Sequence, residues 1–191
     1  MLRTLGAALV LVFFLAGASL VAYARWTRPI TAADAALADG RLDEAIAAYR
    51  TSETRFDQLP AARQLFESEY ARAYGNHLWA LYRAKRYDEV IDLAEKSPAE
   101  ASPHFFSGCA FFLKGAAEEQ PETRLGWFTR AEEEFRKALD SSPGDWDTKY
   151  DFELTTRLAS ELRKQPKTPP KQLMQLLRPP QAGTKQQRRV G

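Results

Sequence analysis

The amino-acid sequence predicts an all-α protein with an N-terminal transmembrane helix, a short array of helical hairpins and a basic tail. Residues 5–24 form an uncharged apolar stretch. Apolar residues then recur at helical spacing to about residue 162, and prolines interrupt the remainder. We therefore expect an anchor in residues 1–28, a helical domain in residues 29–164 and a disordered tail in residues 165–191.

The apolar stretch is long enough to cross a bilayer, because about 20 residues at about 1.5 Å rise each span the hydrocarbon core. Arg3 precedes it and Arg25 and Arg28 follow, so charge bias does not decide its orientation. A cleaved signal peptide is the alternative, since Ala22 and Ala24 are small residues suited to signal peptidase. The run exceeds the usual signal core of about 7 to 15 residues, which favours an uncleaved anchor. Either segment usually directs the remaining chain across the membrane.

The first helical pair is expected in residues 31–51. Thr31 and Asp34 resemble a capping box that opens an alanine-rich helix. That helix would end at Gly40, where a positive φ is easily tolerated. Its partner would begin at Leu42 and extend to about Thr51 or a little beyond.

Two further pairs and a closing helix follow. Pro60 suits the first turn of a long helix that would run to about residue 85, with residues 87–96 as its partner. The third pair would begin near Pro103 and resume over about residues 124–139. A last helix over residues 146–164 would then cover the exposed end of the stack.

Residues 124–146 resemble the second half of a tetratricopeptide repeat (TPR). Ala131, Phe135 and Ala138 fall at helical spacings, and a turn containing Pro143 closes the unit. Such units cannot bury their apolar faces alone, so they stack against one another. The resemblance implies a protein that binds other proteins.

Earlier segments repeat this pattern at irregular intervals. Aligning the small residue that opens the contact of each second helix places Ala45, Val90 and Ala131 in equivalent positions. Their spacings are 45 and 41 residues, whereas the family repeats at about 34 residues. The resemblance therefore covers about residues 32–162 as an irregular TPR-like array.

In TPR proteins the first helix of each unit lines a concave groove that holds a partner segment. The resemblance implies that Trp79, Tyr82 and Arg83 in the second unit face this groove, together with Phe105 and Phe112 in the third. Spacing alone leaves the alternative open that these aromatic side chains belong to the core.

The order of parts carries a closer resemblance. An apolar N-terminal segment and a short repeat array precede residues 143–147, which run into residues 149–154, and the basic tail contains residues 178–183. This order resembles small bacterial TPR proteins encoded with a MoxR-type ATPase and von Willebrand factor A domain proteins, the aerotolerance or MxaK-like group. The resemblance implies a single-pass inner-membrane protein with periplasmic repeats that assists assembly or regulation of a complex with those partners.

The tail is a second candidate binding segment. Residues 162–191 hold eight of the 27 basic residues and none of the 25 acidic ones. Anionic lipid is one possible ligand, at roughly 1 kcal/mol per basic residue near the surface. Nucleic acid is disfavoured, because the tail has no aromatic side chain for base stacking. A partner protein could instead be bound by the tail residues Leu173, Met174, Leu176, Leu177 and Arg178.

The sequence offers little to a catalytic mechanism. His77 and His104 are the two histidines, and neither has partners at metal-ligand spacing. We expect His77 to be exposed or hydrogen-bonded on a helix, Cys109 to be packed and inert, and residues 132–134 to lie on a solvated face. No glycine-rich phosphate loop occurs. We therefore expect a non-enzymatic scaffold without metal or cofactor, with self-association through the last helix as a further alternative.

Overall fold

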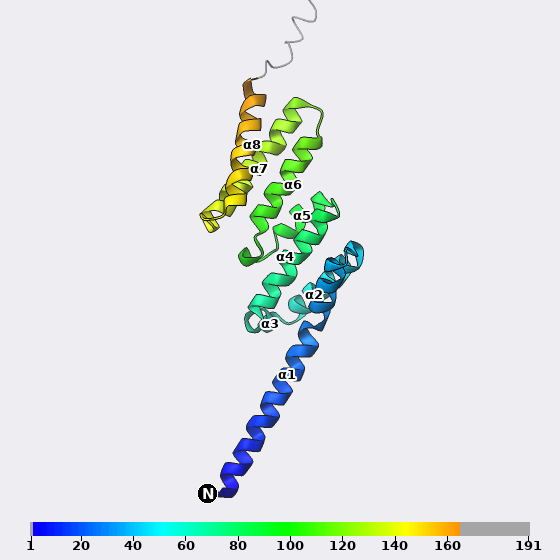
Figure 1. Cartoon of the computed structure of the whole chain (residues 1–191), viewed down its shortest axis with the longest axis vertical. Coiled ribbons are helices and arrows are strands. Elements are labelled where there is room, and N and C mark those ends of the chain that lie inside the picture. The colour runs from blue at the N-terminus through cyan, green and yellow to red at the C-terminus, as the bar shows by residue number, and fades with distance from the viewer. Residues whose placement is uncertain (1, 165–191) are drawn as a thin grey trace, which may run out of the picture.

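The computed structural model describes the backbone of residues 2–164 and the side chains of residues 6 and 9–164. Every regular element of this part of the chain is helical, which confirms the predicted all-α class (Figure 1). The predicted tail, including residues 173–178, lies outside the described residues. The elements are α1 (Leu2–Ala38), α2 (Leu42–Gln58), α3 (Pro60–Leu65), α4 (Glu67–Arg83), α5 (Tyr87–Ala94), the short 3-10 helix η1 (Ala99–Ala101), α6 (Pro103–Ala117), α7 (Pro121–Ser141) and α8 (Trp146–Lys164).

Helix α1 runs without a break from the apolar segment into the helical domain. The predicted helix start at Thr31 is wrong, because Thr31 lies inside α1 and its hydroxyl donates to the Thr27 carbonyl (3.3 Å). Pro29 also lies inside α1, where it removes one backbone hydrogen bond. The helix persists through these residues because the stripe containing Ile30 and Ala33 is fully buried against the domain, and packing outweighs local signals.

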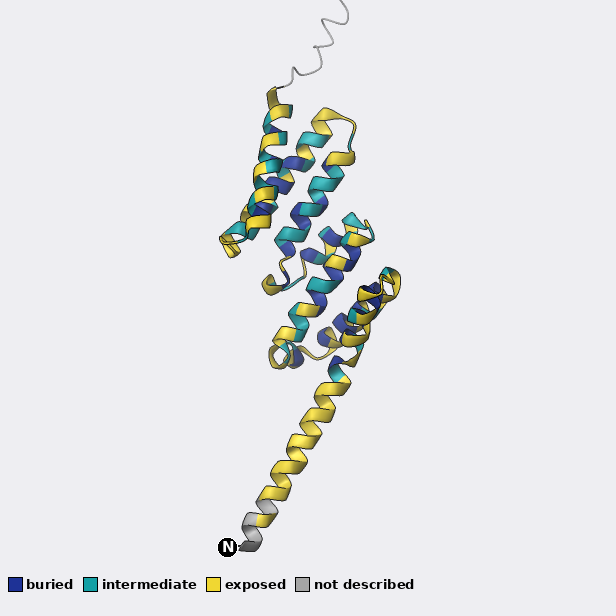
Figure 2. Cartoon of the chain, in the orientation of Figure 1, coloured by how far each residue is buried: buried dark blue, intermediate teal, exposed yellow. Residues whose placement is uncertain are grey.

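The first half of α1 projects away from the domain, and those of its side chains that the structure describes are exposed (Figure 2). Phe13 and Phe14 have exposed fractions of 70% and 72%. Among the described helices, α1 is the one whose length and composition suit a membrane crossing. Apolar surface left in water costs about 25 cal/mol per Å², so this half of α1 is suited to a lipid environment.

The remaining helices pack as successive pairs. Helix α1 packs on α2, α4 on α5, and α6 on α7, while α8 covers α7 at the far end (Figure 1). The first helices of the pairs also contact one another, α1 with α4 and α4 with α6, and α8 contacts α6. Each pair is joined to the next by α2 packing on α4 and α5 packing on α6.

The turns inside the first two pairs have the same backbone conformation. Gly40 and Lys85 both adopt a positive φ, of 76° and 59°. The next amide donates to the carbonyl five residues earlier, at 2.8 Å from Arg41 and 3.0 Å from Arg86. The spacing of 45 residues seen in the sequence therefore recurs in the turns. The three positions that the sequence aligns, all fully buried, are Ala45, Val90 and Ala131.

The long helix predicted from Pro60 is divided at Phe66. Helix α3 ends at Leu65, and Phe66 adopts φ −125° and ψ 47° before α4 begins. The Phe66 ring packs against Tyr23 and Trp26 of α1, with ring centroids 5.8 and 5.9 Å apart. The break thus accompanies aromatic packing between Phe66 and α1, a contact that the local sequence of α3 and α4 does not contain.

Asp34 connects three helices through polar contacts. Its carboxylate accepts hydrogen bonds from the Tyr49 hydroxyl of α2 (2.5 Å) and the Asn76 amide of α4 (2.9 Å). Arg72 of α4 lies 3.6 Å from the other carboxylate oxygen. Burial of Tyr49, helped by the hydrogen bond to Asp34, raises the Tyr49 pKa well above its usual value. These contacts set the register of α1, α2 and α4.

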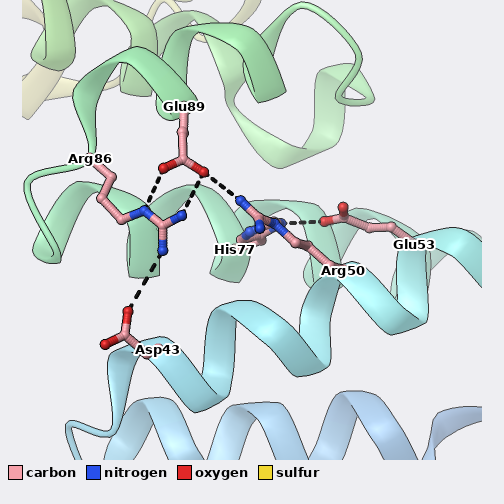
Figure 3. Close-up of polar contacts among 6 residues, drawn as sticks. All are labelled: Asp43, Arg50, Glu53, His77, Arg86 and Glu89. Carbon is pink, nitrogen blue, oxygen red and sulfur yellow. Dashed lines mark hydrogen bonds and ion pairs between the residues drawn. The ribbon is translucent and has the colours of Figure 1, made fainter.

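A second polar cluster joins α2, α4 and α5 (Figure 3). His77 is buried, and its Nδ1 lies 2.6 Å from Oε1 of Glu53, so the hydrogen-bonded alternative for this residue is confirmed and the exposed one is wrong. Nearer the surface, Glu89 of α5 pairs with Arg86 (2.5 Å) and with Arg50 of α2. Exposed ion pairs contribute at most about 1 kcal/mol each, so the buried pair matters more for the packing of α2 on α4.

Gly108 lets α6 approach α7 closely. A Cβ added to Gly108 would lie 2.6 Å from the Phe135 ring, which is 1% exposed and tightly packed. We expect Gly108→Ala to lower the free energy of unfolding by about 1 to 3 kcal/mol. Urea denaturation of the full chain in detergent, followed by circular dichroism, measures this change.

Gly126 is the matched control on α7. A Cβ there would meet nothing within 4 Å, so Gly126→Ala should raise the free energy of unfolding by about 0.5 to 1 kcal/mol. Equal effects of the two substitutions would contradict the close approach of α6 and α7.

Candidate functional site

A crevice of about 460 Å³ lies between α4 and the segment that leads through η1 into α6. Its volume falls in the range of sites that hold a ligand or a peptide side chain. We call it the α4 groove. Its lining residues are Ser68, Ala71, Arg72, Gly75, Asn76, Trp79, Glu100, Ala101, Ser102 and Phe106.

Trp79 forms the aromatic end of the α4 groove. Its side chain is 43% exposed, and its ring stacks on Tyr82 with centroids 5.7 Å apart and an interplanar angle of 17°. The Phe106 ring of α6 lies 6.5 Å away. Trp79 and Tyr82 share one helix face because they are three residues apart. A rigid aromatic surface with one exposed side is the type of anchor that partner proteins bury.

The other end of the α4 groove is polar. Arg72 and Asn76 lie seven and three residues before Trp79, so the three side chains share one face of α4. Asp34 holds the Asn76 amide, and the Arg72 side chain is 48% exposed. Glu100 lines the opposite wall and is exposed. A cation, an amide and a carboxylate thus surround the crevice, which suits the polar backbone of an extended peptide.

Of the five groove residues predicted from the sequence, Trp79 lines the α4 groove, and Tyr82 stacks on Trp79 without lining it. Arg83 points elsewhere: its Nη1 donates to the Leu37 carbonyl at the C-terminal end of α1 (3.3 Å). A cation at that end of a helix is favoured by the partial negative charge of the last carbonyls. Arg83 therefore helps to join α4 to α1.

The other two predicted residues are half-buried between α6 and α7. Phe105 packs on Phe106 and Phe135, with ring centroids 5.6 and 6.3 Å apart. Phe112 packs on Phe128, with centroids 5.5 Å apart. Phe105 thus borders the aromatic end through Phe106, whereas the Phe112 ring lies against the partner helix of its own pair.

The prediction omitted Arg72, Asn76 and Phe106. Arg72 and Asn76 could have been predicted, because they precede Trp79 by seven and three residues and therefore share its helix face. No such signal existed for Phe106. Its position depends on the turn at Ser102, whose φ of 54° directs the chain into α6.

Beyond Tyr82, Cys109 of α6 lies near Asp151 of α8, with 4.0 Å between Sγ and Oδ2. Burial, helped by the nearby carboxylate, raises the pKa of Cys109 to about 12. Burial also raises the pKa of Asp151. The thiol is therefore protonated at neutral pH. Because the thiolate is the reactive form, a protonated Cys109 is a poor nucleophile and a poor metal ligand.

Among the described side chains, no group of three or more His, Cys, Asp or Glu residues could hold a metal ion. His104 instead contacts Glu134, with 2.8 Å between Nδ1 and Oε2. The expectation that residues 132–134 are solvated is wrong for Glu132, which is 8% exposed and pairs with Arg163 of α8 (2.8 Å). Helix α8 covers this carboxylate, a contact that the local sequence of α7 does not encode.

The raised pKa of Cys109 predicts that its thiol reacts slowly with thiol reagents. At pH 8 we expect a thiol reagent to label Cys109 about a hundred- to a thousand-fold more slowly in the folded chain than in urea, because an unfolded cysteine has a pKa near 8.5. The folded rate should increase with pH until the thiol titrates near pH 12. A cysteine placed at the exposed Thr54 in a Cys109→Ser chain is the control, and it should react rapidly in both states. Similar folded and unfolded rates for Cys109 would contradict its burial.

Comparison with known proteins found no family model, no curated protein and no solved structure that matches this chain. The function is therefore inferred from the structure itself, first from the α4 groove and the apolar half of α1.

Proposed function

We propose that this chain is a membrane-anchored, TPR-like scaffold whose α4 groove binds a segment of a partner protein. The observation that carries the proposal is Trp79, which is exposed beside a crevice and stacked on Tyr82. A tryptophan held in this way loses little conformational freedom on binding, so most of its buried area contributes to affinity.

The packing of the helices supports the TPR-like part of the proposal. The first two pairs share their turn conformation, the aligned small residues are buried, and the first helices contact one another in series. In repeat proteins, helices stacked in this way create extended surfaces for partners. The α4 groove lies beside a first helix, as the family resemblance implies.

The continuity of α1 supports an uncleaved anchor. Cleavage after Ala24 would cut within a helix and would remove Tyr23, which donates a hydrogen bond to Glu69 (2.6 Å) and packs on Phe66. From the order of parts, we propose a single-pass protein of the bacterial inner membrane with its helical domain in the periplasm. Its proposed partner is a von Willebrand factor A domain protein or a complex with a MoxR-type ATPase.

Photocrosslinking tests which surface binds the partner. A photoreactive residue is placed at Trp79 or at Leu176 of the full chain, and the adducts are identified by mass spectrometry from solubilised membranes. Ala47, exposed on α2, is the control position. An adduct formed at Trp79 and absent at Ala47 supports the groove. Equal capture of the partner at Trp79 and at Ala47 would contradict binding in the groove.

Removal of the Trp79 side chain should weaken the partner complex. We expect Trp79→Ala to raise the Kd by about 30-fold, the effect of losing a hot spot worth about 2 kcal/mol. Trp146→Ala is the matched control, because Trp146 is 77% exposed on α8, away from the α4 groove. Surface plasmon resonance with the captured partner measures the Kd of each variant. An unchanged Kd for Trp79→Ala would contradict the proposal.

Self-association is the second candidate, because Trp146 and Tyr150 are 77% and 67% exposed on α8. Light scattering of the detergent-solubilised full chain distinguishes the candidates. A dimer that Trp146→Ala dissociates would favour self-association through α8, whereas a monomer favours the scaffold.

Deletion of residues 165–191 tests the tail. We expect the helical circular dichroism signal to be retained and partner capture to weaken by about 10- to 100-fold, because a second linked contact raises effective concentration. A large drop in unfolding temperature would show that the tail is part of the packed domain. If only salt-sensitive binding to liposomes is lost, the tail is a lipid-binding segment.

A further inference from the structure

A second and larger crevice lies at the foot of the helical domain. It has a volume of about 1110 Å³ and is formed by α1 and the C-terminal end of α2, away from the α4 groove. Its apolar lining includes Val21 and Ala22 of α1 and Leu59, which follows α2. We call it the basal crevice.

Three arginines line the polar part of the basal crevice. Arg25 and Arg28 are one turn apart on α1, and Arg55 is in the last turn of α2. All three are exposed, and none forms an ion pair with another described residue. Guanidinium groups bind phosphate through paired hydrogen bonds, so three of them around one cavity form a cationic site suited to a phosphate.

Two carboxylates at this end of the domain have partners of their own, and no acidic residue lines the basal crevice. Asp57 of α2 pairs with Arg63 (2.5 Å). Glu69 of α4 accepts a hydrogen bond from the Tyr23 hydroxyl, which keeps the pKa of Glu69 below its usual value. Both carboxylates are therefore already engaged, and the positive charge of the basal crevice is left for an external anion.

The basal crevice coincides with the end of the apolar segment. Arg25 and Arg28 are one and four residues beyond residue 24, which at about 1.5 Å rise per residue places them within about 6 Å of the end of the hydrocarbon core. Tyr23 and Trp26 lie in the same stretch, and such amphipathic rings favour the bilayer interface. The lining thus extends from apolar residues at the depth of acyl chains to arginines at the depth of headgroups.

We propose that the basal crevice binds the headgroup phosphate of an anionic phospholipid from the membrane that α1 crosses. Arg25, Arg28 and Arg55 contact the phosphate, and the first acyl carbons lie against Val21, Ala22 and Leu59. The proposal rests on the membrane anchor in the proposed function and is independent of the α4 groove and its partner. It assigns lipid recognition to the folded helices and not to the basic tail.

The test uses the full chain in detergent, titrated with phosphatidylglycerol or phosphatidylcholine and followed by native mass spectrometry. We expect at least tenfold tighter binding of phosphatidylglycerol, and a loss of at least tenfold in that affinity in the triple variant Arg25→Gln, Arg28→Gln, Arg55→Gln. The charge-matched control removes Arg130, Arg136 and Arg157 of α7 and α8, which are exposed and outside the basal crevice. The control should bind phosphatidylglycerol like the original chain.

Four outcomes would overturn the proposal. The first is an unchanged affinity for phosphatidylglycerol in the triple variant, and the second is an equal loss of that affinity in the control variant. The third is a loss of the preference for phosphatidylglycerol after deletion of residues 165–191. The fourth is competition by inorganic phosphate at a concentration matched to the lipid. The last would identify a site for a free anion.

Crosslinking keeps the proposal testable if the triple variant does not fold. A photoreactive phosphatidylglycerol added to the unaltered chain should label peptides containing residues 21–29 or 55–59, and labelling confined to other peptides would overturn it. Alkaline carbonate extraction of membranes tests the anchor separately. A failed anchor is thereby distinguished from an anchored chain without a lipid site.

Discussion

The packing of the second half of α1 on α2 supports the rest of the described domain. Ile30, Ala33 and Leu37 form the stripe of α1 that is buried there, and Ala45 and Tyr49 belong to the face of α2 that is buried with it. A helical pair cannot bury its apolar surface alone, so each pair needs a neighbour. Helix α1 provides the first layer and α8 the last, and the same continuous helix carries the segment suited to the membrane.

Hydrophobic periodicity predicted which segments are helical but not all of their boundaries. The last helix occupies the predicted residues 146–164, and α5 and α6 begin at the predicted Tyr87 and Pro103. The predictions near Thr31 and Phe66 were wrong for related reasons. At Thr31 a capping signal is overridden by burial of the surrounding helix, and at Phe66 a helical pattern is interrupted by rings that meet from distant segments. Local patterns do not contain these long-range contacts.

The two candidate sites differ in how far the sequence indicates them. Trp79 and Tyr82 could be proposed because they lie at helical spacing on the first helix of a unit, whereas spacing could not separate core from groove for Phe112, whose environment depends on α7. The basal crevice joins α1 to Arg55, about thirty residues later in the chain. The sequence does not indicate this crevice, because its lining depends on α1 continuing past residue 28 and packing beside the end of α2.

In the proposed anchored chain, an unbroken α1 fixes the height of the domain above the bilayer and its rotation relative to the membrane-crossing half of the helix. A domain on a flexible linker samples many orientations, so its binding surface is spread over a wide volume. Here no loop separates the apolar segment from the packed stripe of α1. Each residue inserted between them would lift the domain by about 1.5 Å and turn it by about 100° around the helix axis. In the proposed anchored chain, the number of residues between the two halves of α1 therefore sets how the α4 groove is rotated relative to the membrane-crossing half of α1.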